Sequence, residues 1–168
     1  VREQAKVNRV FIAYTNLVGG QDELIFDGQS MLVDSDGKVM SRAGAFKEDL
    51  LTVDLDIPIY KAKRIKSIIT VTDELSAKKR PQLLKRQIKP LEPIEENYQA
   101  LSLGLRDYVT KNGFQKVVIG LSGGIDSSLV ATLAIDALGR DNVFGVFMPS
   151  RYSSQESEID AQQLAENL

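Results

Sequence analysis

The stretch "VVIGLSGGIDSSLVA", residues 117–131, decides the fold of this sequence. It starts as a continuous apolar run, meets a group of small residues, and becomes apolar again with the spacing of a helix. An uninterrupted apolar strand that turns directly into a helix is typical of a parallel α/β sheet. We therefore predict a strand at 117–121 and a helix over 126–138, which Gly139 ends. The residues expected to share the apolar face of this helix are Val130, Leu133, Ala134 and Ala137.

The elements around this stretch continue the alternation of strand and helix. A helix is expected from residue 94, ending in a basic turn and a glycine at 111–113. Its apolar residues recur at three- and four-residue steps: Ile94, Tyr98, Leu101, Leu105, Tyr108 and Val109. A second apolar strand is expected at 143–148, followed by a helix over 153–168 with Ser153 and Glu156 at capping-box spacing. This order predicts right-handed crossovers and parallel strands that are buried on both faces.

The first third of the sequence has a β-rich pattern. We expect strands within "VFIAY", "FDGQSMLV", "VMSRA" and "LLTVDLDI", which together span residues 10–57, and β structure starting at Val7. The acidic turn at Asp34–Gly37 predicts a hairpin. Residues 60–93 then carry ten Lys or Arg against three Asp or Glu, with three prolines. Because aromatic residues are nearly absent there, we interpret them as a solvated basic linker rather than a nucleic-acid patch, with a short strand or interdomain contact at 67–71.

Composition excludes several kinds of chemistry. The chain has 168 residues, a formal net charge of −2, and neither cysteine nor histidine. Disulfides, thiol nucleophiles, imidazole bases and the usual zinc sites are therefore excluded from it, which leaves carboxylates, hydroxyls, lysines and backbone amides. The near-neutral charge gives no general attraction to nucleic acid or to an anionic membrane. With no long apolar run and no signal-peptide pattern, we expect a cytoplasmic protein with no nucleic-acid or membrane partner.

The small-residue turn at Gly120–Ser128 has competing interpretations. Residues 120–124 fit G-x-S-x-G, the turn that presents Ser122 as a hydrolase nucleophile, although the chain has no histidine to serve as its base. A dinucleotide fingerprint is excluded because the glycines stand at 120, 123 and 124. A Walker loop is excluded because Asp126, not lysine, precedes Ser127.

A pyrophosphate cradle is the other interpretation of this turn. Gly123 and Gly124 would let the backbone approach an anion, and the next helix would direct its free amides and dipole at that anion. Hydroxyls of Ser122, Ser127 and Ser128 would add donors. A carboxylate repels phosphate unless a cation lies between them, so Asp126 predicts a bridging Mg²⁺. The residues alone leave open that Asp126 and the serines only cap the helix.

At these residues the sequence resembles a known family. The loop at 122–127 reads S-G-G-I-D-S and resembles the S-G-G-x-D-S loop of the ATP pyrophosphatase family, whose members transfer AMP from ATP to an oxygen of their substrate. The stretches "GLRDYVTKNGF" (104–114) and "MPSRYSSQESEIDAQQLAENL" (148–168) are similar to the NAD synthetases of that family. The stretch "TNLVGGQDELIFDGQSMLVDSDGKV" (15–39) resembles the end of a nitrilase-like glutaminase domain. Together they resemble the glutamine-dependent NAD synthetase family.

The resemblance implies an α/β fold with three regions. Residues 1–59 would be the C-terminal part of a nitrilase-like α-β-β-α sandwich, and residues 60–93 a basic linker. Residues 94–168 would form the first βαβ unit of a Rossmann-like ATP pyrophosphatase domain of the adenine nucleotide alpha hydrolase-like kind. The implied activity is that of a carbon-nitrogen ligase that converts deamido-NAD to NAD, using ATP, Mg²⁺, and glutamine or ammonia. A homo-oligomer is expected.

The same resemblance implies a set of nucleotide-binding residues. They are Gly120, Leu121, Ser122, Gly123, Gly124, Ile125, Asp126, Ser127, Ser128, Met148 and Arg151. Asp126 would hold Mg²⁺, and Met148 would lie beside the adenine, where open α/β sheets bind ligands.

The resemblance also implies parts that these residues lack. The family's glutaminase uses a Glu, Lys and Cys triad, which we expect before Val1 because the chain has no cysteine. The start at Val1 and the end inside a helical pattern lead us to expect a piece of a longer protein that is inactive alone. A serine hydrolase at Ser122 and a non-catalytic nucleotide-binding module remain the alternatives.

Overall fold

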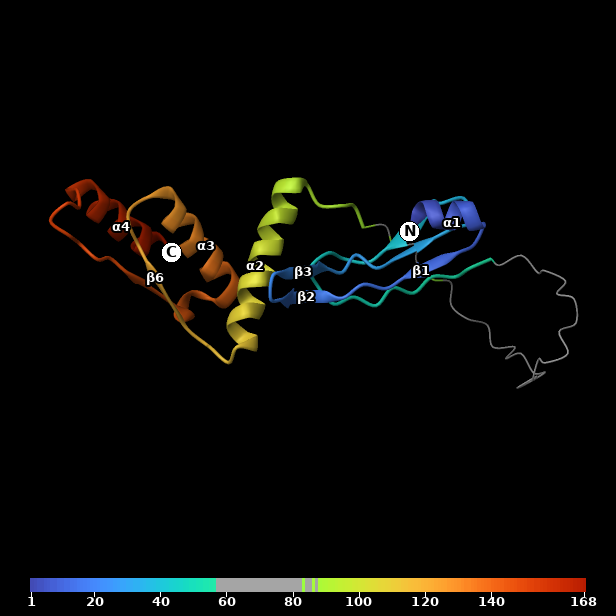
Figure 1. The fold of residues 1–168 in the computed structure, drawn as a ribbon, viewed down its shortest axis with the longest axis horizontal. Helices are drawn as coiled ribbons and strands as arrows, with labels where there is room; N and C mark the ends of the chain where they lie inside the picture. Colours follow the sequence, from blue (N-terminus) through green and yellow to red (C-terminus); the bar gives the residue numbers. More distant parts are fainter. Residues whose placement is uncertain (57–82, 84–85, 87) are drawn as a thin grey trace, which may run out of the picture.

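The computed structural model describes residues 1–56, 83, 86 and 88–168. They form an elongated molecule in which a β-rich part and an α/β part lie on opposite sides of one long helix, α2 (Pro93–Lys111) (Figure 1). None of the helices in these ranges has the length and apolar character needed to cross a membrane. Most of the basic linker, including the strand or contact expected at 67–71, lies outside the described residues.

The β-rich part contains one short helix and two antiparallel sheets. Its elements are α1 (Arg2–Asn8), β1 (Ile12–Tyr14), β2 (Val18–Gln21), β3 (Leu24–Asp27), β4 (Met31–Val33) and β5 (Val39–Arg42). One sheet has the order β1-β4-β5, and β2 pairs with β3 as a separate hairpin. The hairpin predicted at Asp34–Gly37 is confirmed: it joins β4 to β5, and the Asp34 amide donates to the Lys38 carbonyl at 2.9 Å.

Two expectations for this part are wrong. Residues 2–8 form a helix rather than the start of a strand, because Glu, Gln, Ala and Lys favour helix and Arg9 ends it in the left-handed conformation with φ 53°. Residues 50–56 form no strand, although their apolar residues alternate. A strand is defined by its pairing, and no strand in the described part of the chain pairs with these residues.

The α/β part follows the predicted order of elements. Its elements are β6 (Val117–Gly120), α3 (Ile125–Leu138), the 3₁₀ turn η1 (Arg140–Asn142), β7 (Val143–Val146) and α4 (Gln155–Asn167). The two strands pair in parallel, with Val117 opposite Val143, as the alternation of elements predicts. Gly139 ends α3 as expected, with φ 87°. The fold class predicted from the sequence is therefore confirmed.

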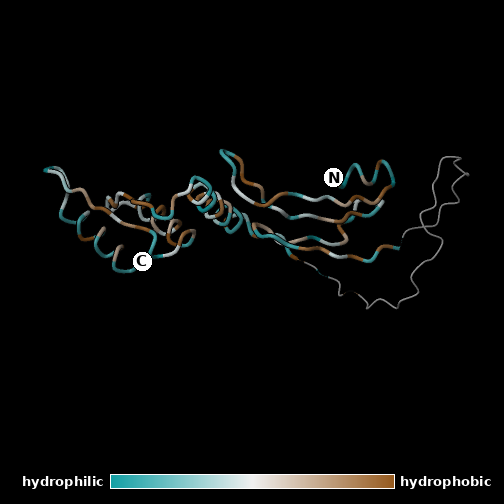
Figure 2. Tube along the Cα trace, turned by 90° about the horizontal axis from the view of Figure 1, so that it is seen from below, coloured by the Kyte–Doolittle hydropathy of each residue, from teal (hydrophilic) through white to brown (hydrophobic). Residues whose placement is uncertain are grey.

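The core of the α/β part lies on one face of its sheet. Leu121, Ala131 and Ala161 are buried together, so that α3 and α4 share a core with the strands. Along most of its length α4 is polar (Figure 2), and its apolar residues Ala161 and Leu164 pack in this core. The other face of the sheet carries Val118 and Phe144, which are 71% and 47% exposed. The expectation of strands buried on both faces is therefore wrong for the described residues.

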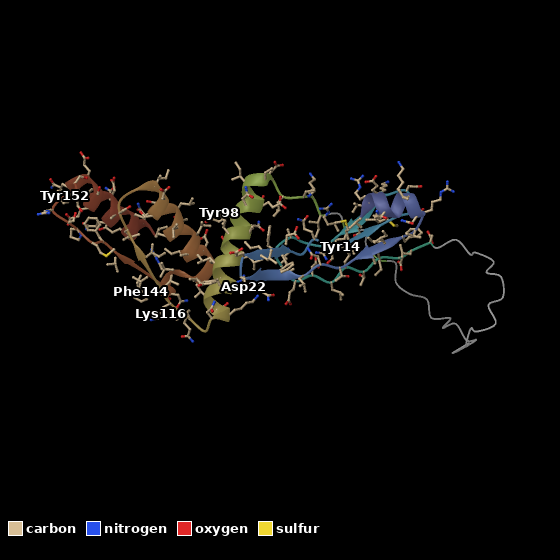
Figure 3. All side chains as sticks on the ribbon, viewed as in Figure 1. Tyr14, Asp22, Tyr98, Lys116, Phe144 and Tyr152 are labelled. Carbon is tan, nitrogen blue, oxygen red and sulfur yellow. The ribbon has the colours of Figure 1, made fainter. Side chains whose placement is uncertain are left out.

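The basic residue Lys116 lies over this uncovered sheet face. Its ammonium group is 5.1 Å from the centre of the Phe144 ring (Figure 3). A cation over an aromatic face is attractive, and the lysine stem covers part of an apolar surface. This contact gives Phe144 a partner in a part of the sheet that no helix covers in the described chain.

The apolar face predicted for α2 is only partly buried. Of its residues, Val109 is buried and Tyr98 and Leu105 are half-buried, but Ile94, Leu101 and Tyr108 are 85%, 54% and 65% exposed. Leu103, which does not belong to the predicted face, is also buried. The helix lies between the β2–β3 hairpin and α3, so two of its sides make contacts. Periodicity alone predicts a single apolar face, and it fails for a helix with two packed sides.

Two further expectations about helices need correction. In α3 the buried residues are Ala131, Leu133 and Ala134, while Val130 is 49% exposed. The cap of α4 is Ser154 rather than Ser153, and its hydroxyl accepts a hydrogen bond from the Ser157 amide at 3.2 Å. The chain offers two adjacent serines, and the capping-box pattern selects the wrong one because Glu156 lies at the second helical position.

One hydrogen bond joins α2 to α3 and gives a testable stability difference. The Tyr98 hydroxyl donates to the Asp136 carboxylate at 2.5 Å, and this bond, with a contribution from burial, raises the pKa of Tyr98 above 10.0. We expect Tyr98→Phe to lower the free energy of unfolding by about 1 kcal/mol, the usual net value of one such bond.

Urea denaturation of the full-length protein checks this expectation. The matched control is Tyr108→Phe, because Tyr108 is 65% exposed and should leave the midpoint unchanged. Because the protonated phenol is the stabilised form, the Tyr98 contribution is complete below pH 10.0 and is lost as the pH rises through the raised pKa. Equal midpoints for the two variants at pH 7 would contradict a stabilising bond.

Candidate functional site

The turn between β6 and α3 is anchored by Leu121. Its side chain is 7% exposed and packs with Ala131 and Ala161, and its amide donates to the Val146 carbonyl at 2.9 Å. Gly145 leaves room for this side chain, because an added Cβ there would lie 2.6 Å from Leu121 Cδ1. Of the predicted site residues, Leu121 can therefore offer a ligand only its backbone, while its side chain fixes the start of the loop.

Serine hydroxyls organise the loop that follows. Ser127 Oγ and Ser128 Oγ each donate to the Gly124 carbonyl at 2.9 Å. Ser122 Oγ lies 3.1 Å from Ser127 Oγ and accepts from the Gly124 amide at 3.2 Å. These bonds close the loop on itself across five residues. The hydroxyls expected to donate to a ligand are thus used to hold the loop in shape.

The first turn of α3 leaves backbone donors free. Gly124 is the N-cap residue, with an extended backbone and no side chain to cap the helix. Among the described residues, no acceptor bonds to the amides of Ile125, Asp126 or Ser127. Free amides at a helix N-terminus carry a partial positive charge and are suited to anions.

The Asp126 side chain is exposed and makes no hydrogen bond or ion pair within the described chain. It therefore does not cap α3 in this structure. No cluster of three His, Cys, Asp or Glu residues suited to a metal occurs in the described ranges, so Asp126 is a lone carboxylate. A lone carboxylate beside a phosphate site fits Mg²⁺, which is usually held by one or two carboxylates together with substrate phosphates and water.

Gly123 allows the loop to contact α4. Its φ is +78°, in the left-handed region, and an added Cβ would lie 2.5 Å from the Ser157 carbonyl oxygen and 2.8 Å from Ser157 Cα. Both of these are backbone atoms, so they cannot move aside without moving the first turn of α4. The role of Ser157 as a wall of the loop is not visible in the sequence, because it is made by its backbone rather than its side chain.

The predicted residues Met148 and Arg151 lie in the segment between β7 and α4. Met148 is 72% exposed, and its Cε would be 3.4 Å from a Cβ added at Gly120, which places it over the end of β6. The Arg151 guanidinium lies 4.9 Å from the centre of the Tyr152 ring, and Tyr152 is 82% exposed. In Figure 3 Tyr152 lies near the end of the molecule farthest from the β-rich part. Within residues 88–168 no hydrogen bond or ion pair joins Arg151 to the loop.

The loop geometry disfavours the hydrolase interpretation of Ser122. A nucleophile elbow places its serine at the strained point of the turn, but here the left-handed residue is Gly123, and Ser122 is not among the residues with positive φ. The Ser122 hydroxyl is also engaged by the Gly124 amide and Ser127, and the sequence contains no histidine. Nothing in the described chain would activate it as a nucleophile.

Comparison with known families divides the chain into two segments. Residues 97–168 match the NAD synthase family, and residues 1–64 match the carbon-nitrogen hydrolase family. The chain joins part of a carbon-nitrogen hydrolase domain to part of an NAD synthase domain. We refer to residues 1–64 as the hydrolase part and to residues 97–168 as the synthase part.

Individual relatives carry the same two segments. The chain is 50% identical to the glutamine-dependent NAD(+) synthetase of Aquifex aeolicus, over 100% of the chain and 32% of that protein. It is 49% identical to the enzyme of the same description from Thermotoga maritima, over 95% of the chain and 30% of that protein. The chain thus spans about a third of the length of these curated relatives.

A solved structure has the same fold across both parts. The glutamine-dependent NAD+ synthetase of Acinetobacter baumannii, solved in complex with adenosine diphosphate, superposes with a TM-score of 0.73 at 36% identity. The superposition covers 99% of this chain and 28% of that protein. Such a score over the whole chain requires the hydrolase and synthase parts to superpose together.

Proposed function

We propose that the full-length protein that contains this chain is a glutamine-dependent NAD synthetase. One observation carries the proposal: a helix N-terminus whose amides and carboxylate have no partner among the described residues lies in a segment that matches the NAD synthase family, and a segment that matches the hydrolase family precedes it. In the proposed reaction, the hydrolase domain converts glutamine and water to glutamate and ammonia. The synthase domain uses ATP to replace a carboxylate oxygen of deamido-NAD by that ammonia.

The loop is suited to the ATP-dependent step. An oxygen of the deamido-NAD carboxylate attacks the α-phosphorus of ATP, the bond to the β-phosphate breaks, and pyrophosphate leaves. Ammonia then attacks the resulting acyl-adenylate, and AMP leaves with the former carboxylate oxygen. Amides of Ile125, Asp126 and Ser127 would donate to phosphate oxygens, and Gly123 and Gly124 would leave room for the phosphates.

The remaining residues take supporting roles in this proposal. Asp126 would hold Mg²⁺, which when bound neutralises charge on the departing pyrophosphate. Leu121 fixes the loop to the core, and the hydroxyls of Ser122, Ser127 and Ser128 keep its shape. Gly120 and Met148 would lie beside the nucleotide, and Arg151 would also contact it. We expect a cytoplasmic homo-oligomer.

Assay of the purified full-length protein tests the proposed function. With ATP, Mg²⁺ and deamido-NAD, we expect NAD formation from either glutamine or ammonia, with one AMP and one pyrophosphate formed per NAD. Residues 1–168 alone are expected to form no NAD, because they contain no cysteine for the expected glutaminase triad and span about a third of the length of the relatives. Formation of ADP in place of AMP, or fluorophosphonate labelling that Ser122→Ala abolishes, would contradict the proposal.

A further inference from the structure

The hydrolase part rests on the synthase part through two glycines. Gly20 of β2 faces Gly104 of α2, where an added Cβ on Gly20 would lie 3.1 Å from Gly104 Cα. A Cβ added to Gly104 would in turn lie 2.9 Å from Ile25 Cδ1 of β3. The β2–β3 hairpin and α2 therefore approach at backbone distance, which larger residues would prevent (Figure 1).

Two charged residues of α2 bond to the same hairpin residue. The Gly20 amide donates to Asp107 Oδ2 at 2.9 Å, and Lys111 Nζ donates to the Gly20 carbonyl at 2.6 Å. Asp107 and Lys111 also form an ion pair at 3.2 Å, one helical turn apart. We call Gly20, Asp107 and Lys111 the interdomain clamp. It joins residues that are 87 and 91 positions apart in the sequence.

The charge state of the clamp agrees with this geometry. The Asp107 side chain is 14% exposed, and burial by itself would raise its pKa. The hydrogen bond from the Gly20 amide and the nearby Lys111 outweigh that burial and hold the pKa of Asp107 below 3.8. At neutral pH the carboxylate is therefore ionised and bonded, and charge-assisted bonds of this kind are stronger than neutral ones.

The clamp uses backbone groups of a strand edge. Gly20 lies in β2, whose pairing within the described chain is to β3 alone, so its other edge faces outward. An open strand edge can pair with any suitable partner, and here helix side chains satisfy it instead. Because both the amide and the carbonyl of Gly20 bond to side chains of α2, the hairpin is fixed in its position along α2 as well as in its distance from that helix.

We propose that Asp107 and Lys111 are positioning residues that hold the hydrolase domain against the synthase domain, so that ammonia released by one is used by the other. This inference rests on the proposed function. Ammonia that must pass between two active sites is lost to solvent if the sites separate. Two domains already held in the right orientation lose no further translational or rotational entropy when the ammonia is transferred. Neither residue touches the loop at 121–124, so the ATP-dependent chemistry should not depend on the clamp.

The test compares two nitrogen sources in the full-length protein. We expect Asp107→Ala and Lys111→Met each to keep the rate of NAD formation from saturating ammonia within about twofold of the unmodified protein. With glutamine, the NAD formed per glutamate formed should fall at least about threefold, because unguided ammonia escapes. Asp107→Glu should recover part of this ratio. The matched control is Glu95→Ala, an exposed acidic position in the first turn of the same helix.

The outcomes separate the clamp from the proposed function. If the ratio of NAD to glutamate is unchanged in both clamp variants, or if both variants lose rate from both nitrogen sources in parallel, the positioning role is wrong. If the unmodified protein makes no NAD from either source, the proposed function is wrong. A variant that fails to fold is recognised by its loss of the ammonia-dependent rate, and the other variant then decides.

Discussion

A Gly123→Ala protein is expected to lose ATP-dependent NAD synthesis by at least about 100-fold, the cost of a misplaced reacting group. Alanine at φ +78° is unfavourable by about 1–2 kcal/mol. Its Cβ would also lie 2.5 Å from the Ser157 carbonyl oxygen, closer than any real contact of this kind. Either the loop or the first turn of α4 must move, and both border the proposed phosphate site.

Stability and activity should fall together in this variant. The cost of the strained φ and the cost of overpacking against the Ser157 backbone add together. We therefore expect a decrease of about 2–5 kcal/mol in the free energy of unfolding. Activity is measured as kcat/KM for ATP with ammonia as the nitrogen source, well below the unfolding temperature. Urea denaturation gives the stability.

Gly124→Ala is the matched control for the backbone. Gly124 has φ −91°, which alanine adopts freely, and the nearest atom to an added Cβ is the rotatable Ser122 Oγ at 3.3 Å. We expect its free energy of unfolding to stay within about 1 kcal/mol of the unmodified protein, as for a site without strain. If Gly123→Ala were as stable and as active as the unmodified protein, the contact between loop and α4 would be refuted.

The strand-loop-helix unit could be predicted from sequence because its signals are local. A continuous apolar run, three glycines and a helical period lie within fifteen residues, and the structure places β6, the loop and the start of α3 there. The hairpin at Asp34–Gly37 is local in the same sense, since Asp34 bonds to the amides of Asp36 and Lys38 in its own turn. Local pattern and tertiary structure agree at these positions.

Features set by contacts between distant residues could not be predicted. The exposed stripe of Ile94, Leu101 and Tyr108 has the period of a buried face, but the hairpin and α3 occupy other sides of α2. The interdomain clamp depends on a glycine peptide meeting Asp107, about ninety residues later, and no spacing rule connects them. In the loop, the sequence did not predict the use of Ser127 and Ser128 as donors to the Gly124 carbonyl.

The variant Asp126→Asn is expected to show whether Asp126 binds a metal ion or caps α3. A neutral amide is a weaker ligand for Mg²⁺ than a carboxylate, and the bound ion is expected to neutralise charge on the leaving group. We expect ATP-dependent NAD synthesis to fall at least about 100-fold at low millimolar Mg²⁺, the scale of losing one electrostatic stabiliser of a transition state. Raising the Mg²⁺ concentration should restore part of the rate, because the ligand is weakened rather than removed.

Stability should change little in the same variant. Asp126 is exposed and, in the described chain, accepts no hydrogen bond, so its replacement removes only a favourable interaction with the helix dipole of about 0.3–1 kcal/mol. Asp160→Asn on α4 is the matched control, since that carboxylate is also exposed but lies outside the first turn of its helix. This control should leave both the free energy of unfolding and the rate of NAD synthesis unchanged.

The opposite result, a loss of stability with the rate of NAD synthesis retained, would indicate that Asp126 acts as a helix cap. A loss of more than about 2 kcal/mol in unfolding free energy, the upper value for a cap, with the NAD synthesis rate intact would show that the carboxylate stabilises α3 and holds no ion. A rate that falls but does not respond to added Mg²⁺ would likewise count against a metal ligand. Because Asp126 and the three amides beside it have no bonding partner in the described part of the chain, a metal-dependent loss of rate at constant stability is the expected result.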